Sequence, residues 1–216
     1  MIFNLSETPT IANQYIAEIR DVNIQKDRMR FRKNMERIGE ILAFEISKTL
    51  KYKKQQVETP LGIAEIQLPS QRIVIATILR AGLPLHQGML NIFDQADNAF
   101  ISAYRLHHKG GTFEVNLEYV SCPNLDDCVL IITDPMLATG ASMDLAIKAL
   151  LEYGQPAKIH VVTAIASSPG LSYMKRLYKK ANFWVGAIDE ELTAKSYIVP
   201  GLGDAGDLAY GSKLQE

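Results

Sequence analysis

Short apolar runs alternate with amphipathic helical stretches along most of the chain. The apolar runs lie at 73–79, 99–104, 113–120, 128–133, 159–165 and 183–188, and the helical stretches lie at 28–50, 84–93, 142–153 and 170–181. Continuous apolar runs of strand length, separated by helices, are typical of a mostly parallel sheet that is covered on both faces. The pattern therefore predicts an α/β fold with a mainly parallel central sheet flanked by helices.

Two local patterns precede this alternation. Residues 28–50 repeat apolar side chains at helical spacing, which predicts an amphipathic helix. These side chains are Phe31, Met35, Ile38 and Leu42. Residues 55–72 are polar and are punctuated by proline and glycine, which predicts a short hairpin. The length of 216 residues favours a single domain over 1–216, with an N-terminal helical arm at about 10–50.

The strongest candidate site follows the apolar run at 128–133. In open α/β sheets, ligands bind beyond the carboxyl ends of the strands. The residues that follow this run are Asp134, Pro135, Met136, Leu137, Ala138, Thr139, Gly140, Ala141 and Ser142. Small side chains let backbone N–H groups approach a ligand, hydroxyls add donors, and the start of a helix adds partial positive charge. The segment predicts an anion cradle, most naturally for a phosphate, with a carboxylate placed for sugar hydroxyls.

This loop also has a simpler interpretation. It lacks the G-K-[S/T] of a Walker A motif. Ser142 could serve as the N-cap of the following helix and Asp134 as a turn former, without any ligand. Both interpretations stay open on this segment alone.

Two arginines follow other apolar runs. Arg80 comes directly after the run at 73–79, and Arg105 after the run at 99–104. A guanidinium suits the oxygens of phosphate or pyrophosphate, although a surface arginine after a strand is also common. Because parallel strands end at one edge of a sheet, we expect Arg80, Arg105 and the loop at 134–142 to converge there.

The segment from Gly201 to Gly206 reads G-x-G-x-x-G, but its context does not fit a dinucleotide site. Such a site opens a helix within a unit of about 30 residues and needs an acidic residue about 20 residues further on. Only ten residues follow Gly206. We interpret the segment as a loop whose backbone groups contact a flat heterocycle, with Asp204 and Asp207 as nearby carboxylates. A flexible turn is the alternative.

Charge and composition limit the remaining classes. The formal net charge is −1, so the basic footprint of a nucleic-acid-binding protein is missing, and no apolar stretch is long enough to span a membrane. No secretory signal precedes residue 10. The two cysteines, Cys122 and Cys128, lack metal-site spacing and are expected to be reduced thiols in the cytoplasm. Trp184 is expected in the core or at an interface, and His86 as a structural or solvent-facing residue.

Together these motifs resemble the uracil phosphoribosyltransferases, from the hairpin to the C-terminus and more weakly through the helix at 28–50. The matching segments are residues 78–82, 104–105, 134–142 and 197–207. The last, Y-I-V-P-G-L-G-D-A-G-D, is the most specific, because it separates uracil-using members from other phosphoribosyltransferases. The resemblance implies the type I phosphoribosyltransferase fold, with a small hood from the hairpin and C-terminal segments. It implies transfer of the phosphoribosyl group of phosphoribosyl pyrophosphate (PRPP) to uracil, which gives UMP and pyrophosphate.

The same resemblance implies roles for the candidate residues. By carry-over, residues 134–142 hold the 5′-phosphate and ribose, and Arg80 and Arg105 contact the pyrophosphate. Ile198, Gly203, Asp204 and Ala205 hold uracil, within a base-binding segment at about 190–216. Asp204 lies near PRPP and its Mg²⁺, and we expect the metal to arrive bound to PRPP rather than in a cage of side chains.

The resemblance also implies properties beyond the site. It suggests a homodimer or homotetramer, GTP as an effector, and salvage of the free base in the cytoplasm, with no nucleic acid or membrane as partner. The loop after Arg105 departs from the family pattern, because it is basic and longer: Leu106-His107-His108-Lys109-Gly110-Gly111. Two alternatives stay open. One is a PRPP- or pyrimidine-sensing regulator that binds RNA, and the other is a phosphoribosyltransferase for a different base.

Overall fold

The computed structural model describes residues 1–107 and 113–213, and at 103–107 and 113–117 it describes the backbone alone. The expected helix at 28–50 and the hairpin are both present. In chain order the N-terminal half comprises β1 (Ile2–Asn4), a 3-10 turn (Leu5–Glu7), α1 (Ile11–Arg20), α2 (Arg28–Ser47), β2 (Tyr52–Thr59), β3 (Gly62–Pro69), β4 (Ile73–Leu79), α3 (Leu83–Ile92) and β5 (Asp97–His107).

The C-terminal half continues the alternation. It comprises β6 (Phe113–Ser121), β7 (Val129–Thr133), β8 (Met136–Leu137), α4 (Ala141–Leu150), a 3-10 turn (Leu151–Tyr153), β9 (Lys158–Ser167), α5 (Ser168–Leu177), β10 (Asn182–Asp189), β11 (Glu191–Leu192), β12 (Ile198–Val199) and α6 (Ala205–Tyr210). The main corrections to the predicted elements concern their ends. The helix predicted at 170–181 ends at Leu177, and the strand predicted to end at residue 104 runs on to His107.

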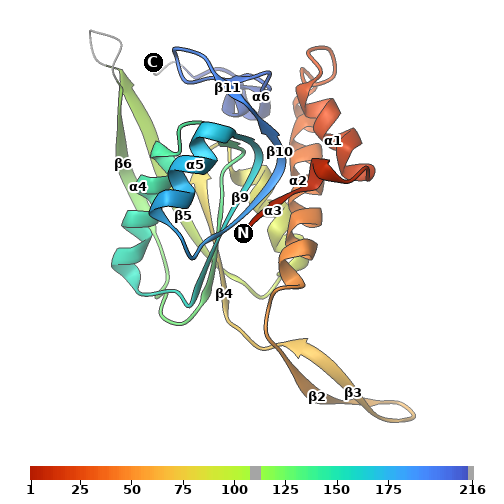
Figure 1. The fold of residues 1–216 in the computed structure, drawn as a ribbon. Coiled ribbons are helices and arrows are strands. Elements are labelled where there is room, and N and C mark those ends of the chain that lie inside the picture. The colour runs from red at the N-terminus through yellow and green to blue at the C-terminus, as the bar shows by residue number, and fades with distance from the viewer. Residues whose placement is uncertain (108–112, 214–216) are drawn as a thin grey trace.

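The central sheet has the order β1-β10-β9-β7-β4-β5-β6, with β8 pairing with β9 (Figure 1). All neighbours pair in parallel except β5 and β6, which are antiparallel. The carboxyl ends of β4, β7 and β9 therefore lie at one edge, and the C-terminal segment with α6 lies over that edge in Figure 1. The predicted fold class is confirmed.

Alternate residues of the strands face two separate layers of helices, because successive side chains of a strand point to opposite faces. One hydrophobic core joins α1, α2 and α3 to strand residues such as Ile75, Ile131 and Val162. The other joins α4 and α5 to residues such as Val74 and Ile132. The continuous apolar runs that predicted the strands reflect this burial on both faces.

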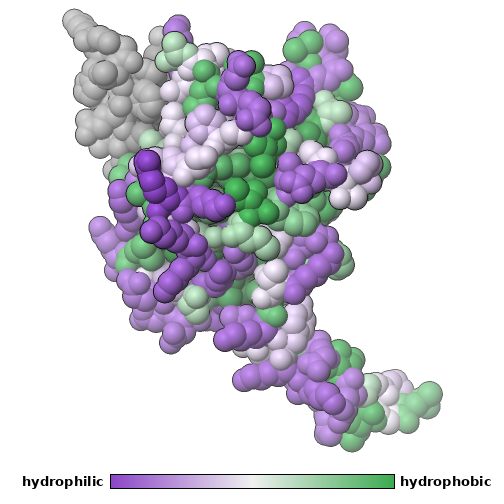
Figure 2. Space-filling view, in the orientation of Figure 1, coloured by the Kyte–Doolittle hydropathy of each residue, from purple (hydrophilic) through white to green (hydrophobic). Residues whose placement is uncertain are grey.

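The hairpin of β2 and β3 lies apart from the C-terminal segment. Since only residues 70–72 separate β3 from the first residue of β4, the hairpin projects from the amino end of that strand, and Figure 1 shows it extending from the opposite end of the molecule. The expected shared hood is thus corrected: only the C-terminal segment covers the carboxyl edge. The hairpin tip carries exposed apolar side chains, Leu61 at 100% and Ile63 at 69% exposure (Figure 2).

Among the residues that the structure describes, no helix is both long and apolar enough to cross a membrane. Both thiols are free, as expected. Burial raises the pKa of Cys122 to about 11, so the reactive thiolate is scarce at neutral pH.

Trp184 lies in the core, where its indole Nε1 donates to His160 Nδ1 at 2.8 Å. His160 is 2% exposed, and this burial lowers its pKa to about 4. Nδ1 of His160 can accept this hydrogen bond only when the imidazole ring is neutral. The unfolded chain binds a proton on this residue near pH 6.5, so folding stability from His160 is present above that pH and is lost as pH falls toward 4.

We predict that the free energy of unfolding falls by about 2 kcal/mol from this group between pH 7.5 and pH 5. Urea titrations at the two pH values measure the change. His160→Asn keeps an acceptor for the indole and removes the titration, so its pH dependence should be shallower by that amount. Equal slopes for both proteins would contradict the assignment.

Candidate active site

The loop at 134–142 forms an open helix N-terminus at the carboxyl edge of the sheet. Gly140 caps α4 with φ +86°, and no side chain bonds the first amides of the helix from the cap position. Thr139 Oγ1 accepts from the N–H of Ala141 at 3.3 Å. The simpler interpretation placed Ser142 at the N-cap, but Ser142 lies within the first turn of α4. The remaining first-turn amides carry the partial positive charge of the helix and suit an anion.

The loop is supported from below by the start of α5. Ser167 Oγ donates to the carbonyl oxygen of Ala138 at 2.5 Å and accepts from the N–H of Gly170 at 2.9 Å. A Cβ added at Gly170 would lie 2.1 Å from that same carbonyl oxygen. The backbone of the loop at Ala138 therefore packs directly against Gly170, and a side chain at position 170 would displace it.

Asp134 stands at the end of β7, as predicted, and its backbone N–H donates to the carbonyl of Val162 at 3.1 Å. The ends of β7 and β4 are joined by two buried hydroxyls. Thr133 Oγ1 donates to the carbonyl of Ala76 at 3.2 Å, and Thr77 Oγ1 donates to the carbonyl of Thr133 at 3.4 Å. A Cβ added at Gly82 would lie 2.2 Å from Thr77 Oγ1 and 3.1 Å from the carbonyl oxygen of Thr133. The turn after β4 thus packs against the end of β7.

Arg80 lies in that turn and reaches the C-terminal segment. Its Nη2 donates to Asp207 Oδ1 at 3.0 Å and to the carbonyl oxygen of Gly211 at 2.6 Å. The peptide bond between Leu79 and Arg80 is cis. The Arg80 side chain is 39% exposed, so the guanidinium is available to a ligand from solvent.

The C-terminal segment meets the same turn. Asp204 caps α6 and its Oδ1 accepts from the N–H of Asp207 at 3.0 Å. A Cβ added at Gly206 would lie 3.7 Å from the Ala81 Cβ and 3.9 Å from Arg80 Nε. The segment interpreted as a heterocycle-binding loop is therefore partly helical and packs beside Arg80. Asp204 and Gly203 are exposed, whereas Ile198 and Ala205 are buried.

The third expected member, Arg105, lies on the extended part of β5. Its backbone pairs with Val115 of β6, beyond Ser102, the last residue of β5 that pairs with β4. The antiparallel partner β6 explains why the strand continues past the carboxyl edge. The Arg105 side chain and residues 108–112 of the following basic loop fall outside the part of the chain that the structure describes.

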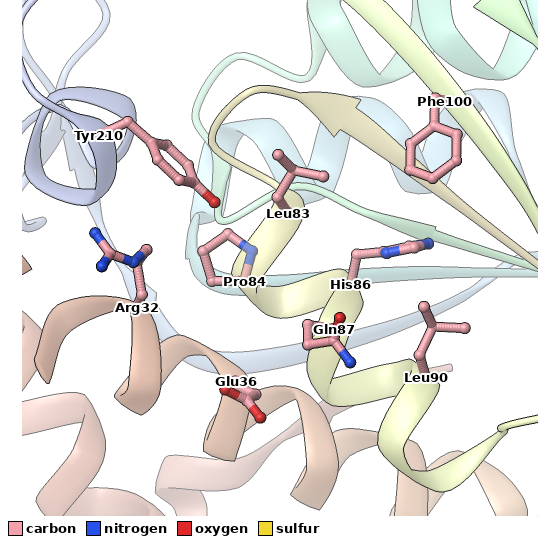
Figure 3. Close-up of a pocket in the computed structure, with 9 residues that line it drawn as sticks. All are labelled: Arg32, Glu36, Leu83, Pro84, His86, Gln87, Leu90, Phe100 and Tyr210. Atoms are coloured by element: carbon pink, nitrogen blue, oxygen red, sulfur yellow. The ribbon is translucent and has the colours of Figure 1, made fainter. Parts of the chain in front are cut away.

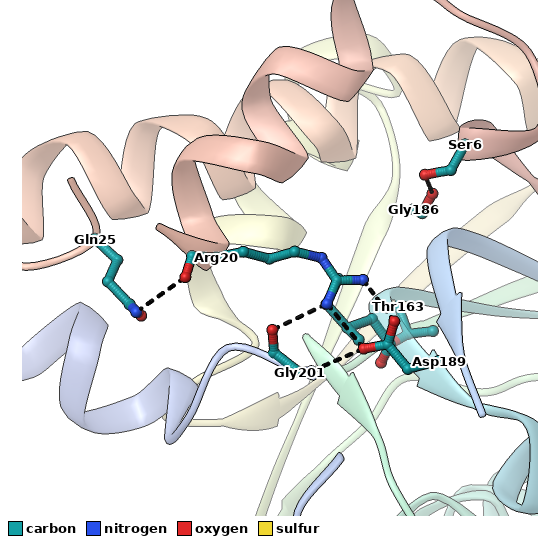
Figure 4. A network of polar contacts seen from close by, with 8 residues as sticks. Ser6, Arg20, Gln25, Thr163, Gly186, Asp189 and Gly201 are labelled. Atoms are coloured by element: carbon teal, nitrogen blue, oxygen red, sulfur yellow. Dashed lines mark hydrogen bonds and ion pairs between the residues drawn. The ribbon is translucent and has the colours of Figure 1, made fainter. Parts of the chain in front are cut away.

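Two residues outside the C-terminal segment, which the sequence analysis did not single out, bond to its backbone. Arg20, the last residue of α1, pairs with Asp189 at the end of β10 through both carboxylate oxygens at 2.8 Å (Figure 4). Arg20 also donates to the carbonyl of Gly201 at 2.9 Å, and Asp189 accepts from the N–H of Gly201 at 2.9 Å. These contacts join residues up to 181 positions apart, so no local pattern announces them.

A hollow of about 420 Å³ borders this region between α2, α3, β5 and α6 (Figure 3). It is lined by Arg32, Glu36, Leu83, Pro84, His86, Gln87, Leu90, Phe100 and Tyr210. His86 is buried, and burial lowers its pKa. Burial raises the pKa of Tyr210, against the opposing effect of Arg32 and Arg80. None of the lining residues is a predicted site residue.

Comparisons with known proteins agree in family and in fold. The family model for uracil phosphoribosyltransferase matches residues 5–212. A uracil phosphoribosyltransferase of Porphyromonas gingivalis is 50% identical over 214 residues, with 99% of each chain covered. One of Thermococcus gammatolerans is 35% identical, covering 99% of this chain and 95% of the relative. The solved AQ2163 protein of Aquifex aeolicus superposes with a TM-score of 0.89 at 31% identity, covering 99% of this chain and 100% of its own.

Proposed function

Because the chain belongs to the uracil phosphoribosyltransferase family, we propose how its residues transfer the phosphoribosyl group of PRPP to uracil. The products are UMP and pyrophosphate. Because the transferred group is a pentose, the enzyme is a pentosyltransferase. The bond from C1′ to the pyrophosphate oxygen breaks, a bond from C1′ to uracil N1 forms, and N1 loses its proton. The ion pair of Arg80 with Asp207 carries the assignment of roles, because it joins the base-binding segment to the pyrophosphate arginine.

The 5′-phosphate is bound in the cradle at 134–142. The amides at the start of α4, the Thr139 hydroxyl and the Ser142 hydroxyl donate to the phosphate oxygens, and the Asp134 carboxylate accepts from the ribose hydroxyls. Gly140 supports this geometry because its φ of +86° lies in the left-handed region that favours glycine. The glycine support beneath Ala138 holds the loop in place before the substrate arrives.

The leaving pyrophosphate meets Arg80 and Arg105. When it departs, C1′ develops cationic character and the pyrophosphate gains negative charge, which fixed guanidinium groups stabilise. Uracil N1 must then lie in line with the breaking bond, and such orientation contributes about 7–11 kcal/mol in favourable cases. Positioning and charge stabilisation, rather than a covalent intermediate, account for the rate in this proposal.

Mg²⁺ fits this site as a companion of the substrate. The nearby donors are the carboxylates of Asp134 and Asp204, and among the described residues no group of three or more His, Cys, Asp or Glu could hold a metal. Magnesium prefers phosphate oxygens and water, and when bound to PRPP it neutralises pyrophosphate charge. Asp204 and Asp134 are the residues that would contact it.

Uracil is bound by the segment at 198–205. The edge of uracil offers carbonyl acceptors and N–H donors. The backbone N–H and C=O groups of Ile198, Gly203 and Ala205 form the matching hydrogen bonds. Gly203 has φ +96° with no atom within 4 Å of an added Cβ, which leaves an open backbone face for the ring. The Asp204 carboxylate would accept the N1 proton or, with Mg²⁺ bound, would hold a water beside N1.

Asp204→Asn is expected to lower kcat at least about a hundredfold while the fold survives, since general acid–base contributions are typically of that size or larger. Asparagine caps a helix as well as aspartate does, so α6 keeps its cap and only the charge is lost. Steady-state release of pyrophosphate measures the rate, and thermal unfolding checks the cap. Unchanged turnover would remove Asp204 from the mechanism.

The assay that tests the reaction measures pyrophosphate release from PRPP with uracil, hypoxanthine, xanthine and orotate in turn. Release with uracil alone is expected. Release with another base alone would replace the substrate. A salt-dependent gel shift with pyrimidine-operon leader RNA, in the absence of turnover, would favour the regulator, which the family model does not favour.

We further propose a homodimer or homotetramer. The support is the hairpin of β2 and β3, whose exposed apolar tip includes Leu61 and Ile63 (Figure 2), because large exposed apolar side chains on a projecting arm suit a protein contact. Light scattering after gel filtration gives the mass, and a monomer at micromolar concentration would contradict the proposal. The proposal also includes GTP as an effector and a cytoplasmic location. The two free thiols support the location.

A further inference from the structure

Both backbone groups of Gly201 are held by one buried ion pair. The Asp189 carboxylate is 6% exposed and the Arg20 side chain 21%. Arg20 Nη1 and Nη2 each donate to one oxygen of Asp189, and Arg20 Nη1 donates to the Gly201 carbonyl as well. Oδ2 of Asp189 also accepts a hydrogen bond from the N–H of Gly201. Figure 4 shows the guanidinium between the carboxylate and the loop.

Arg20 is itself fixed at the end of α1. Gln25 Nε2 donates to the carbonyl oxygen of Arg20 at 3.2 Å, and the N–H of Asp21 bonds to Ala17 at the C-cap. Asp189 is the last residue of β10, whose register with β9 extends to the pair Asp189 and Ser167. The two members of the pair therefore stand on rigid elements, one in the helical layer and one in the sheet.

Gly201 is closely packed within the base-binding segment and has no room for a side chain. Its φ is +56°, and an added Cβ would lie 2.2 Å from the carbonyl oxygen of Ile198. It separates Ile198 from Gly203, the residues whose backbone groups face the base in the proposed function. Backbone groups that recognise a ligand must be held in place by the residues around them, and Arg20 and Asp189 are the side chains that bond the backbone of Gly201.

We propose that Arg20 and Asp189 are positioning residues that fix the base-binding segment through Gly201, so that uracil affinity depends on the N-terminal helix α1. This inference rests on the proposed function for its ligand. It adds that the pair affects uracil binding more than PRPP binding, because its contacts reach Gly201, whereas the phosphate cradle is supported separately by Ser167 and Gly170.

The test separates position from stability with one single and one double variant. Arg20→Met leaves a buried carboxylate without its cation and is expected to destabilise the protein. Arg20→Met with Asp189→Leu removes both charges, and apolar replacement of a buried pair restores stability in many cases. Arg20→Met loses the contact to the Gly201 carbonyl and keeps only the one from the Gly201 N–H to Asp189, whereas the double variant loses both. We expect KM for uracil to rise at least tenfold in both, KM for PRPP to stay within twofold, and the urea midpoint to recover only in the double variant.

Arg72→Met is the matched control. Arg72 also donates to one carboxylate, Asp97, and to the backbone carbonyls of Asn124 and Asp126, but at the amino end of the strands. Its KM for uracil should stay within twofold. Arg20→Lys keeps a charge without the two-pronged geometry and is expected to raise KM for uracil by an intermediate factor, which provides a folded variant if the others fail.

Two results would overturn the proposal. One is that KM for uracil stays within twofold of the parent value in Arg20→Met or in the double variant. The other is that KM for uracil and KM for PRPP rise by the same factor. Wild-type turnover of uracil is measured alongside. If the parent protein does not use uracil, the proposed function fails. If it does and the variants keep its KM, only the role of the pair fails.

Discussion

Arg80→Gln is expected to lower kcat/KM for PRPP by two to three orders of magnitude. The guanidinium follows β4 directly, reaches the carboxyl edge and is 39% exposed, so it can meet a charge that develops on the leaving group. Loss of one donor that acts in the transition state typically costs about 10²–10³ in rate. Pyrophosphate release at low PRPP concentration measures the effect.

Arg80 also bonds to α6, so replacing it could displace this helix as well as remove a donor to pyrophosphate. A second variant separates the two effects. The ion pair with Asp207 is half-exposed, and such pairs contribute about 0–1 kcal/mol to stability. Asp207→Asn breaks the pair and leaves the arginine, and its kcat/KM is expected to stay within tenfold of the parent. If Asp207→Asn loses as much activity as Arg80→Gln, the arginine acts by holding α6 rather than by binding pyrophosphate.

Gly170→Ala is expected to lower kcat/KM for PRPP about a hundredfold, although Gly170 contacts no substrate in the proposed mechanism. The new Cβ would lie 2.1 Å from the carbonyl oxygen of Ala138, so either the loop at 134–142 or the start of α5 must move by about 1 Å. A displacement of that size at a binding group costs about 10²-fold in rate. We also expect a loss of about 1–3 kcal/mol in stability from overpacking.

Gly88→Ala provides the control. Its Cβ would lie 2.0 Å from the carbonyl oxygen of Glu36, at the contact of α3 with α2. Overpacking there should lower stability similarly, but kcat/KM for PRPP should stay within twofold of the parent, because the strained contact is remote from the phosphate cradle. An equal loss of kcat/KM for PRPP in both variants would show that overpacking anywhere in the protein, and not the position of the loop at 134–142, lowers the activity.

The sequence predicted the parts of the fold that depend on local pattern. Runs such as 73–79 and 128–133 are apolar throughout because both faces of the sheet are covered, and α2 buries the residues expected from its spacing. Edge strand β1 was missed, since three residues with one exposed and two half-buried positions carry no periodic signal. Strand order predicted that Arg80 and the loop at 134–142 lie at one edge, and the structure packs the turn after β4 against the end of β7. The ion pair of Arg80 with Asp207 of the C-terminal segment was not predicted from strand order.

Other features depend on contacts between distant segments. The pair of Arg20 and Asp189, and the support of Ala138 by Gly170, become visible only when residues far apart in sequence are in place. Helix α6 is different, because a local signal existed. Asp204, followed by the acidic Asp207 in the first turn, is an N-terminal capping pattern, but the glycines around it favoured a loop interpretation.

The pairing of the first strand with β10 also has a consequence for the order in which a newly made chain can fold. Ser6 bonds to Gly186, and Arg20 to Gly201, across 180 and 181 positions. At about 5–20 residues per second on the ribosome, the early partners wait roughly 10–40 s for the late ones. The apolar face of α1 stays unpaired with β10 during that interval, so the binding site for the base is completed only after residue 201 has been made. Until then, the uncovered face of α1 is what a chaperone would protect.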